Sequence, residues 1–118
     1  MIFSQANHID QIKAGQKTQT RRPSPRYRKG HTYAIQPGRT KPGIPEGRIL
    51  ITQKWREVSY INSTISPAAA AAEGGYTPEE YEALYAEMYP NWSHRWAYAF
   101  EYIPNTQKPL TDYEEATA

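Results

Sequence analysis

Lys17 and Thr20 stand three residues apart in the stretch AGQKTQTRR, residues 14–22, and both side chain types can take part in acyl transfer. A threonine hydroxyl is a weak nucleophile by itself and needs a neighbouring base to remove its proton. A lysine whose amino group is partly desolvated can serve as that base. Glu73 is a candidate acid that could protonate a leaving amine. The three residues are chemically sufficient for hydrolysis of an amide, although the same spacing also fits a lysine that simply faces solvent from a strand.

Basic residues concentrate in the first part of the chain. Residues 1–48 carry ten Lys and Arg against two acids, whereas residues 49–118 carry four against ten acids. Guanidinium groups pair with phosphate oxygens, and tyrosine rings accept stacked bases. The candidate ligand-binding residues are therefore Arg21, Arg22, Tyr33 and Arg39. Three alternatives remain open: the charges face water, one of the adjacent arginines pairs with an acid, and the tyrosine is packed in the fold.

The elements around Lys17 follow from local signals. Asn7 can cap a short helix, and Gly15 stands where a left-handed residue commonly ends one. Lys17 is therefore expected just beyond a helix end. Residues 18–22 are typical of an extended segment, which Pro23 terminates because it lacks an amide donor.

The next strands and the loop between them are predicted from hydrophobic pattern and turn residues. Residues 31–36 and 47–55 are the clearest strands. The stretch PGRTKPGIPEG, residues 37–47, is rich in proline and glycine and predicts a long loop.

Two helices are predicted next. One begins with Ser66 as its cap and stops at Gly74 and Gly75, which leaves Glu73 at its negatively polarised end, where a cation would be favoured. The other begins with a capping box of Thr77 and Glu80. Its apolar stripe is predicted to face the core and consists of Tyr81, Leu84, Tyr85 and Met88.

The last strand is predicted from strict alternation in RWAYAFEYI, residues 95–103. Its aromatic face, expected to be buried, consists of Trp96, Tyr98, Phe100 and Tyr102.

Composition narrows the class of protein. A chain of 118 residues with three Trp, ten Tyr and two Phe is expected to form one folded domain. It contains no cysteine, which excludes disulfides and thiolate sites, and the distant histidines His8, His31 and His94 do not predict a metal site. No cofactor is expected. The start of the chain lacks a signal-peptide pattern and no apolar run could cross a membrane, so a cytoplasmic protein is predicted.

Several separated stretches together resemble the ASCH domain family. They are GQKTQTRR, KGHTYAIQPGR, GRILITQKWREVSYI and AEGGYTPEEYEALYAEMYP, followed by the aromatic final strand. The glycine, lysine, threonine and arginine of the family motif fall on Gly15, Lys17, Thr20 and Arg22. The resemblance covers roughly residues 2–103.

The resemblance implies an α+β fold, namely a PUA-like small mixed β-barrel with flanking helices around a cleft. On this basis residues 1–103 are assigned to one ASCH domain and residues 104–118 to a polar, acidic, loosely ordered tail. The family is associated with RNA binding, and the resemblance implies that Lys17, Thr20 and Glu73 line the cleft.

One branch of the family resembles an amidohydrolase that removes the acetyl group from acetylated cytidine. By motif position, the resemblance implies Lys17 as proton acceptor, Thr20 as nucleophile and Glu73 as proton donor. The sequence departs from that branch in the residues after the lysine, in the loop at 37–47 and after the glutamate, which leaves the substrate open. The expected partner is RNA or a modified nucleoside. The alternatives are a non-catalytic RNA-binding module and a metal-independent ribonuclease that uses Lys17 and a tyrosine.

Overall fold

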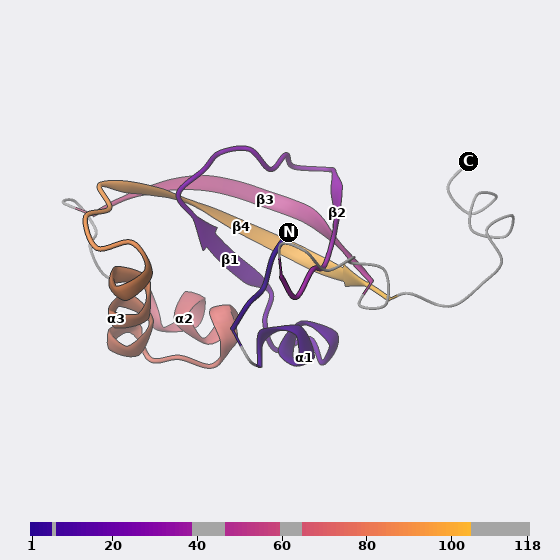
Figure 1. Ribbon diagram of the computed structural model, residues 1–118, viewed down its shortest axis with the longest axis horizontal. Helices are drawn as coiled ribbons and strands as arrows, with labels where there is room; N and C mark the ends of the chain where they lie inside the picture. The colour runs from indigo at the N-terminus through magenta and orange to yellow at the C-terminus, as the bar shows by residue number, and fades with distance from the viewer. Residues whose placement is uncertain (6, 39–46, 60–64, 105–118) are drawn as a thin grey trace, which may run out of the picture.

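The computed structural model describes residues 1–5, 7–38, 47–59 and 65–104 of the chain. Its elements, shown in Figure 1, are α1 (His8–Lys13), β1 (Gln19–Arg22), β2 (Thr32–Ala34), β3 (Arg48–Val58), α2 (Pro67–Gly74), α3 (Pro78–Met88) and β4 (His94–Ile103). The fold is therefore mixed α+β, as predicted. Apart from Pro104, the predicted tail lies outside the described residues, as does most of the predicted loop at 37–47.

The four strands form one antiparallel sheet in the order β1-β4-β3-β2. β3 and β4 form the long central ladder, with a register shift between Ile51 and Gln53. β1 pairs with β4 from Trp96 to Ala99, whereas β2 pairs with the opposite end of the ladder through Arg48–Leu50 of β3.

The predicted barrel does not close, and this part of the prediction was wrong. Among the described residues, the edge strands β1 and β2 do not pair with each other. They have only four and three residues and lie at opposite ends of the central ladder, so their free edges cannot meet. A single parallel bridge from Ile2 to Gln36 joins the N-terminal segment to the chain after β2.

Local helix signals are largely confirmed. Gly15 follows α1 with φ 76°, and Ser66 accepts a hydrogen bond from the Ala69 amide at the start of α2. The capping box of Thr77 is present at α3. Asn7 is the N-cap residue of α1, as predicted, but its side chain makes no capping hydrogen bond.

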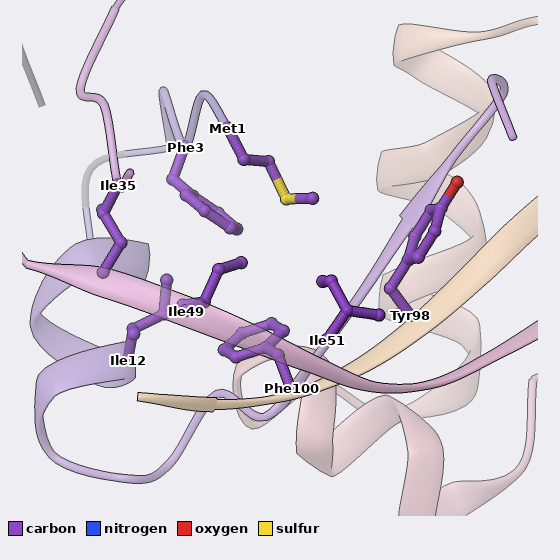
Figure 2. Close-up of a cluster of buried hydrophobic side chains, with 8 residues drawn as sticks. All are labelled: Met1, Phe3, Ile12, Ile35, Ile49, Ile51, Tyr98 and Phe100. Atoms are coloured by element: carbon purple, nitrogen blue, oxygen red, sulfur yellow. The ribbon is translucent and has the colours of Figure 1, made fainter. Parts of the chain in front are cut away.

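The main core lies between the central ladder and the N-terminal segment. Figure 2 shows side chains of β3 and β4 gathered beneath Met1 and Phe3. Its buried members are Met1, Phe3, Ile12, Ile35, Ile49, Ile51, Tyr98 and Phe100. Within the aromatic stripe of β4, Tyr98 and Phe100 are buried as predicted, whereas Trp96 and Tyr102 are only half-buried.

A second core joins the two longer helices. α2 contacts both α3 and β1 (Figure 1), and Tyr81 and Tyr85 of α3 are buried there with Ala70 and Ile65. The rest of the predicted α3 stripe does not enter this core. Met88 is 43% exposed and lines a pocket instead.

Candidate functional site

The three residues proposed for acyl transfer line one pocket of about 340 Å³, named here the Lys17 pocket. Lys17 follows α1, Thr20 lies on β1 and Glu73 lies in the last turn of α2. The full lining consists of Ile2, Phe3, Ser4, Gln5, His8, Lys17, Thr20, Arg21, Arg22, Glu73, Tyr81, Leu84, Met88 and Tyr89. The lining thus combines apolar and aromatic side chains with charged ones, and the volume suits a small ligand.

Backbone hydrogen bonds hold these segments together. The Lys17 amide donates to the Gln11 carbonyl at 3.1 Å, and the Thr18 amide donates to the Ala72 carbonyl at 2.8 Å. The Gln11 side chain donates to the Gly74 carbonyl at 2.8 Å. The chain between α1 and β1 is therefore tied to the C-terminal end of α2, which brings Lys17 beside Glu73.

Lys17 is almost fully buried, with 1% of its side chain exposed. Its ammonium group donates to the Gln19 carbonyl at 2.9 Å, to the Glu73 carbonyl at 2.7 Å and to Glu73 Oε1 at 3.0 Å. Three acceptors match the three donors of an ammonium group. Burial lowers the pKa of Lys17, whereas the charge and hydrogen bond of Glu73 oppose that shift.

Glu73 accepts a cationic hydrogen bond on each carboxylate oxygen. Oε1 accepts from Lys17, and Oε2 accepts from Arg21 Nη1 at 2.7 Å. The sequence left unexplained why an acid ends this helix. The structure explains it, because two buried cations offset the unfavourable helix dipole.

Thr20 is buried, but its hydrogen-bond partner is not the lysine. Its hydroxyl oxygen accepts a hydrogen bond from Arg22 Nε at 3.1 Å. Within the described residues there is no hydrogen bond between Lys17 and Thr20, and the hydroxyl proton has no acceptor. The proton is thus available to a ligand in the Lys17 pocket.

The two adjacent arginines have different surroundings, because successive side chains of a strand point to opposite faces. Arg21 is buried and donates to Glu57 through Nε and Nη2 at 2.9 and 3.0 Å, in addition to its bond to Glu73. Arg22 is half-buried, donates to the Ile2 carbonyl at 2.7 Å and lies 5.0 Å from the centre of the Phe3 ring. The alternative that one of the pair binds an acid is confirmed, and the paired residue is Arg21.

Sequence reasoning missed the buried ion network beyond Arg21. Glu57 Oε1 accepts hydrogen bonds from both Arg21 and Arg95 at 2.9 Å, and Arg95 also binds both oxygens of Glu82 at 2.9 Å. Glu57 and Arg95 are direct cross-strand partners in β3 and β4. Only the strand register could have revealed the pair, since 38 residues separate them in sequence.

The network strongly favours the ionised form of its central acid. Burial would raise the pKa of Glu57, but the hydrogen bonds and charges of Arg21 and Arg95 outweigh it and lower that pKa to about 2. The Trp55 indole donates to the same carboxylate at 3.1 Å. Glu57 thereby fixes Arg21, which in turn holds Glu73 at the pocket.

His8 is a further pocket residue that the chemical argument from sequence did not include. Its Nε2 lies 2.8 Å from the Tyr76 hydroxyl. Burial, with the charges of Lys17 and Arg22, lowers the pKa of His8 to about 4, so it is neutral at physiological pH.

Of the two remaining candidate ligand-binding residues, the structure describes Tyr33, which does not line the Lys17 pocket. Tyr33 is half-buried, packs edge-on against Tyr27 with 4.9 Å between ring centres and accepts a hydrogen bond from the Arg28 amide at 2.8 Å. It lines a different pocket from Lys17. Arg39 lies outside the described residues.

Two other kinds of feature are absent from the described ranges. Among them, no cluster of three or more His, Cys, Asp or Glu side chains could hold a metal ion. No helix in this part of the chain is long and apolar enough to traverse a lipid bilayer.

No family model and no curated protein matches the sequence, but solved structures match the fold. The ASCH domain from Lactobacillus crispatus JV V101 superposes with a TM-score of 0.66 at 15% identity, over 80% of this chain and 69% of that one. A DUF984 protein from Enterococcus faecalis V583 gives a TM-score of 0.60 at 17% identity, over 93% of this chain and 72% of that one. The predicted ASCH fold is therefore confirmed.

Proposed function

Because the chain has the fold of an ASCH domain, we propose that it binds RNA or a modified nucleoside, with one base held in the Lys17 pocket. The observation that carries this proposal is the convergence of Lys17, Thr20 and Glu73 on one pocket of about 340 Å³. The RNA association implied by the family resemblance points in the same direction.

The chemistry of the pocket suits a flat heterocycle with polar edges. Phe3 and Tyr81 supply aromatic surface, and base stacking on such rings contributes about 1–3 kcal/mol per base. Thr20 offers a hydroxyl proton that has no acceptor among the described residues, which can be donated to a base carbonyl or ring nitrogen. The Lys17 pocket can thus contact both the apolar faces and the hydrogen-bonding edges of a base.

Binding is tested with a panel of nucleosides by calorimetry and with labelled single-stranded RNA by fluorescence anisotropy across a salt series. Thr20→Val removes the hydroxyl and keeps the side chain volume, and is expected to weaken binding about fivefold, as for one lost hydrogen bond. The matched control is Thr18→Val, since Thr18 is exposed and does not line the pocket. Equal binding by the two variants, or no binding by the wild type at low salt, would contradict the proposal.

Amide hydrolysis is a second candidate function, favoured by the 3.0 Å contact between Lys17 Nζ and Glu73 Oε1. A proton passed along this contact gives a neutral amine and a carboxylic acid, the two states that acyl transfer needs. Burial of Lys17 lowers its pKa and so favours the neutral amine.

In this mechanism the Thr20 hydroxyl attacks the acyl carbonyl of an acetylated cytidine, and the Lys17 amine takes the hydroxyl proton. The bond from the acyl carbon to the exocyclic nitrogen breaks as Glu73 gives its proton to the leaving amine. This step restores the resting ammonium–carboxylate pair and leaves acetylated Thr20, which water then hydrolyses. The Thr20 hydroxyl must turn from Arg22 toward Lys17 when substrate binds, as catalytic contacts often tighten only in the complex.

Chromatography of acetylated cytidine after incubation with the protein tests hydrolysis directly. Conversion to cytidine that disappears in Thr20→Val and persists in Thr18→Val is the expected result. Conversion at the wild-type rate by Thr20→Val would refute the role of Thr20 as the nucleophile. Binding without conversion would refute hydrolysis and would leave the first proposal intact, with the protein acting as a non-catalytic binding module.

A further inference from the structure

A second hollow of about 600 Å³ adjoins the Lys17 pocket and is named here the arginine groove. Its chemistry comes from Arg22, Arg26, Arg48, Tyr27 and Tyr33. The two hollows are neighbours, since Arg22 and Ile2 line both of them.

No acid among the described residues neutralises the three arginines of the groove. The lining contains no Asp or Glu, and within the described residues none of these arginines has a carboxylate partner. By contrast, the buried Arg21 and Arg95 are each bound to two glutamates.

The groove arginines are held in position but retain free donors. Arg48 donates to the hydroxyl and the carbonyl of Thr32, both at 3.1 Å, and Arg26 lies 5.2 Å from the centre of the Tyr27 ring. Arg22 uses Nε and Nη2 for its contacts with Thr20 and the Ile2 carbonyl. Each guanidinium has five N–H donors, so every one of them keeps donors for a ligand.

The three arginines line this hollow together with Met1. Partial burial of the Met1 amino group, together with the positive charges of Arg22, Arg26 and Arg48, lowers its pKa to about 6. Guanidinium groups that share one hollow and have no carboxylate partner among the described residues suit an anion with several oxygens.

We propose that the arginine groove binds a phosphate carried by the nucleoside whose base occupies the Lys17 pocket. The ligand is then a nucleotide, either free or within a single-stranded RNA. Arg22 connects the two sites, because its guanidinium contacts the Thr20 hydroxyl on one side and lines the groove on the other. This inference rests on the proposed function and specifies the chemical class of its ligand.

The test compares cytidine and acetylated cytidine as free nucleosides, as 5′- and 3′-monophosphates, and within a short single-stranded RNA. A charged hydrogen bond to phosphate is expected to make at least one monophosphate bind about tenfold more tightly than its nucleoside. Arg48→Gln is expected to remove that gain and to leave nucleoside affinity unchanged, because Arg48 does not line the Lys17 pocket. In the RNA arm, losing one phosphate contact reduces the salt slope of log K by about 0.7.

Arg56→Gln is the matched control. Arg56 is an exposed arginine on β3 like Arg48, but lies eight residues further along, about 26 Å away, and lines another pocket. Thermal unfolding of both variants checks that the fold is retained. The control should bind every probe as the wild type does.

The outcomes separate the two proposals. The phosphate site in the arginine groove is overturned if the wild type binds nucleosides but no phosphate increases its affinity. It is also overturned if Arg48→Gln keeps the full increase in affinity. Either result leaves the proposed function intact. Absence of binding to nucleosides, nucleotides and RNA alike overturns both. A gain with monophosphates identifies a free nucleotide as sufficient, whereas a gain confined to the RNA identifies the strand as the ligand.

Discussion

Replacing Glu57 with glutamine removes the central acid of the buried ion network and keeps its size. Glu57 joins Arg21 to Arg95, and its side chain is only 21% exposed. Because both arginines retain another glutamate, the substitution should weaken the network without unfolding it. The predicted signature is a change in how stability depends on pH.

The magnitude follows from the pKa of Glu57. Burial opposes the charges of Arg21 and Arg95, which prevail and lower the pKa from 4.5 to about 2. At 1.36 kcal/mol per pKa unit this difference stabilises the folded state by about 3 kcal/mol at neutral pH. The folded-state pKa is the lower one, so this contribution is present above about pH 4.5 and is lost as the pH falls to 2. About half of it is gone by pH 3.

Urea denaturation between pH 2 and 7, followed by tryptophan fluorescence, measures the effect. Glu57→Gln should be about 3 kcal/mol less stable than the wild type at pH 7, and the gap should close as the pH falls toward 2. Trp55, one of three tryptophans in the chain, donates to the Glu57 carboxylate, so part of the fluorescence signal comes from the site itself. Glu101→Gln is the matched control, because Glu101 is an exposed glutamate on β4.

Two results would refute the reasoning. A gap between Glu57→Gln and the wild type that stays constant from pH 7 to 2 would mean that ionisation of Glu57 does not stabilise the fold. An equal loss of stability in Glu101→Gln would mean that removal of any glutamate charge produces the effect.

Two further predictions concern the segment around the pocket. Gly74→Ala should destabilise the protein by more than Gly75→Ala. Both glycines have positive φ, 145° at Gly74 and 83° at Gly75. A Cβ at Gly74 would also lie 2.8 Å from Gln11 Oε1, whereas a Cβ at Gly75 would have no atom within 4 Å. In thermal unfolding we expect Gly75→Ala to lose about 1 kcal/mol of stability. Equal losses in the two variants would contradict the predicted clash at Gly74. Lys17→Met should cost about 3 kcal/mol in urea denaturation, because it removes one partner of a buried ion pair, whereas Lys29→Met at an exposed position should cost almost nothing. A small loss in Lys17→Met would show that the pair contributes little to folding.

Local sequence signals were sufficient for most of the elements. Gly15 predicted the end of α1, and the Thr77 capping box predicted the start of α3, because both depend on interactions within a few residues. Asn7 takes the predicted N-cap position of α1, but its side chain does not form the capping hydrogen bond although its residue type is suitable. A cap needs one particular side chain geometry, and residue type alone does not determine it.

The candidate site was predictable only in part. The family resemblance pointed to Lys17, Thr20 and Glu73, and the structure brings them to one pocket. It could not reveal that the partner of Thr20 is Arg22, since that contact depends on how side chains turn within β1. The sequence also could not show that the sheet stays open, because closure depends on where the short edge strands pair along the central ladder.

The sequence by itself determined the helices, the strands and the excess of basic residues before residue 49, since backbone preference and composition are local properties. Only the tertiary structure decided which of those charges are neutralised. It buried Arg21 between two glutamates and left Arg22 beside the groove, although the two are neighbours in sequence. The physical reason is that the sheet sends alternate side chains to opposite faces, and only one of these faces meets the acids brought by β3 and α2.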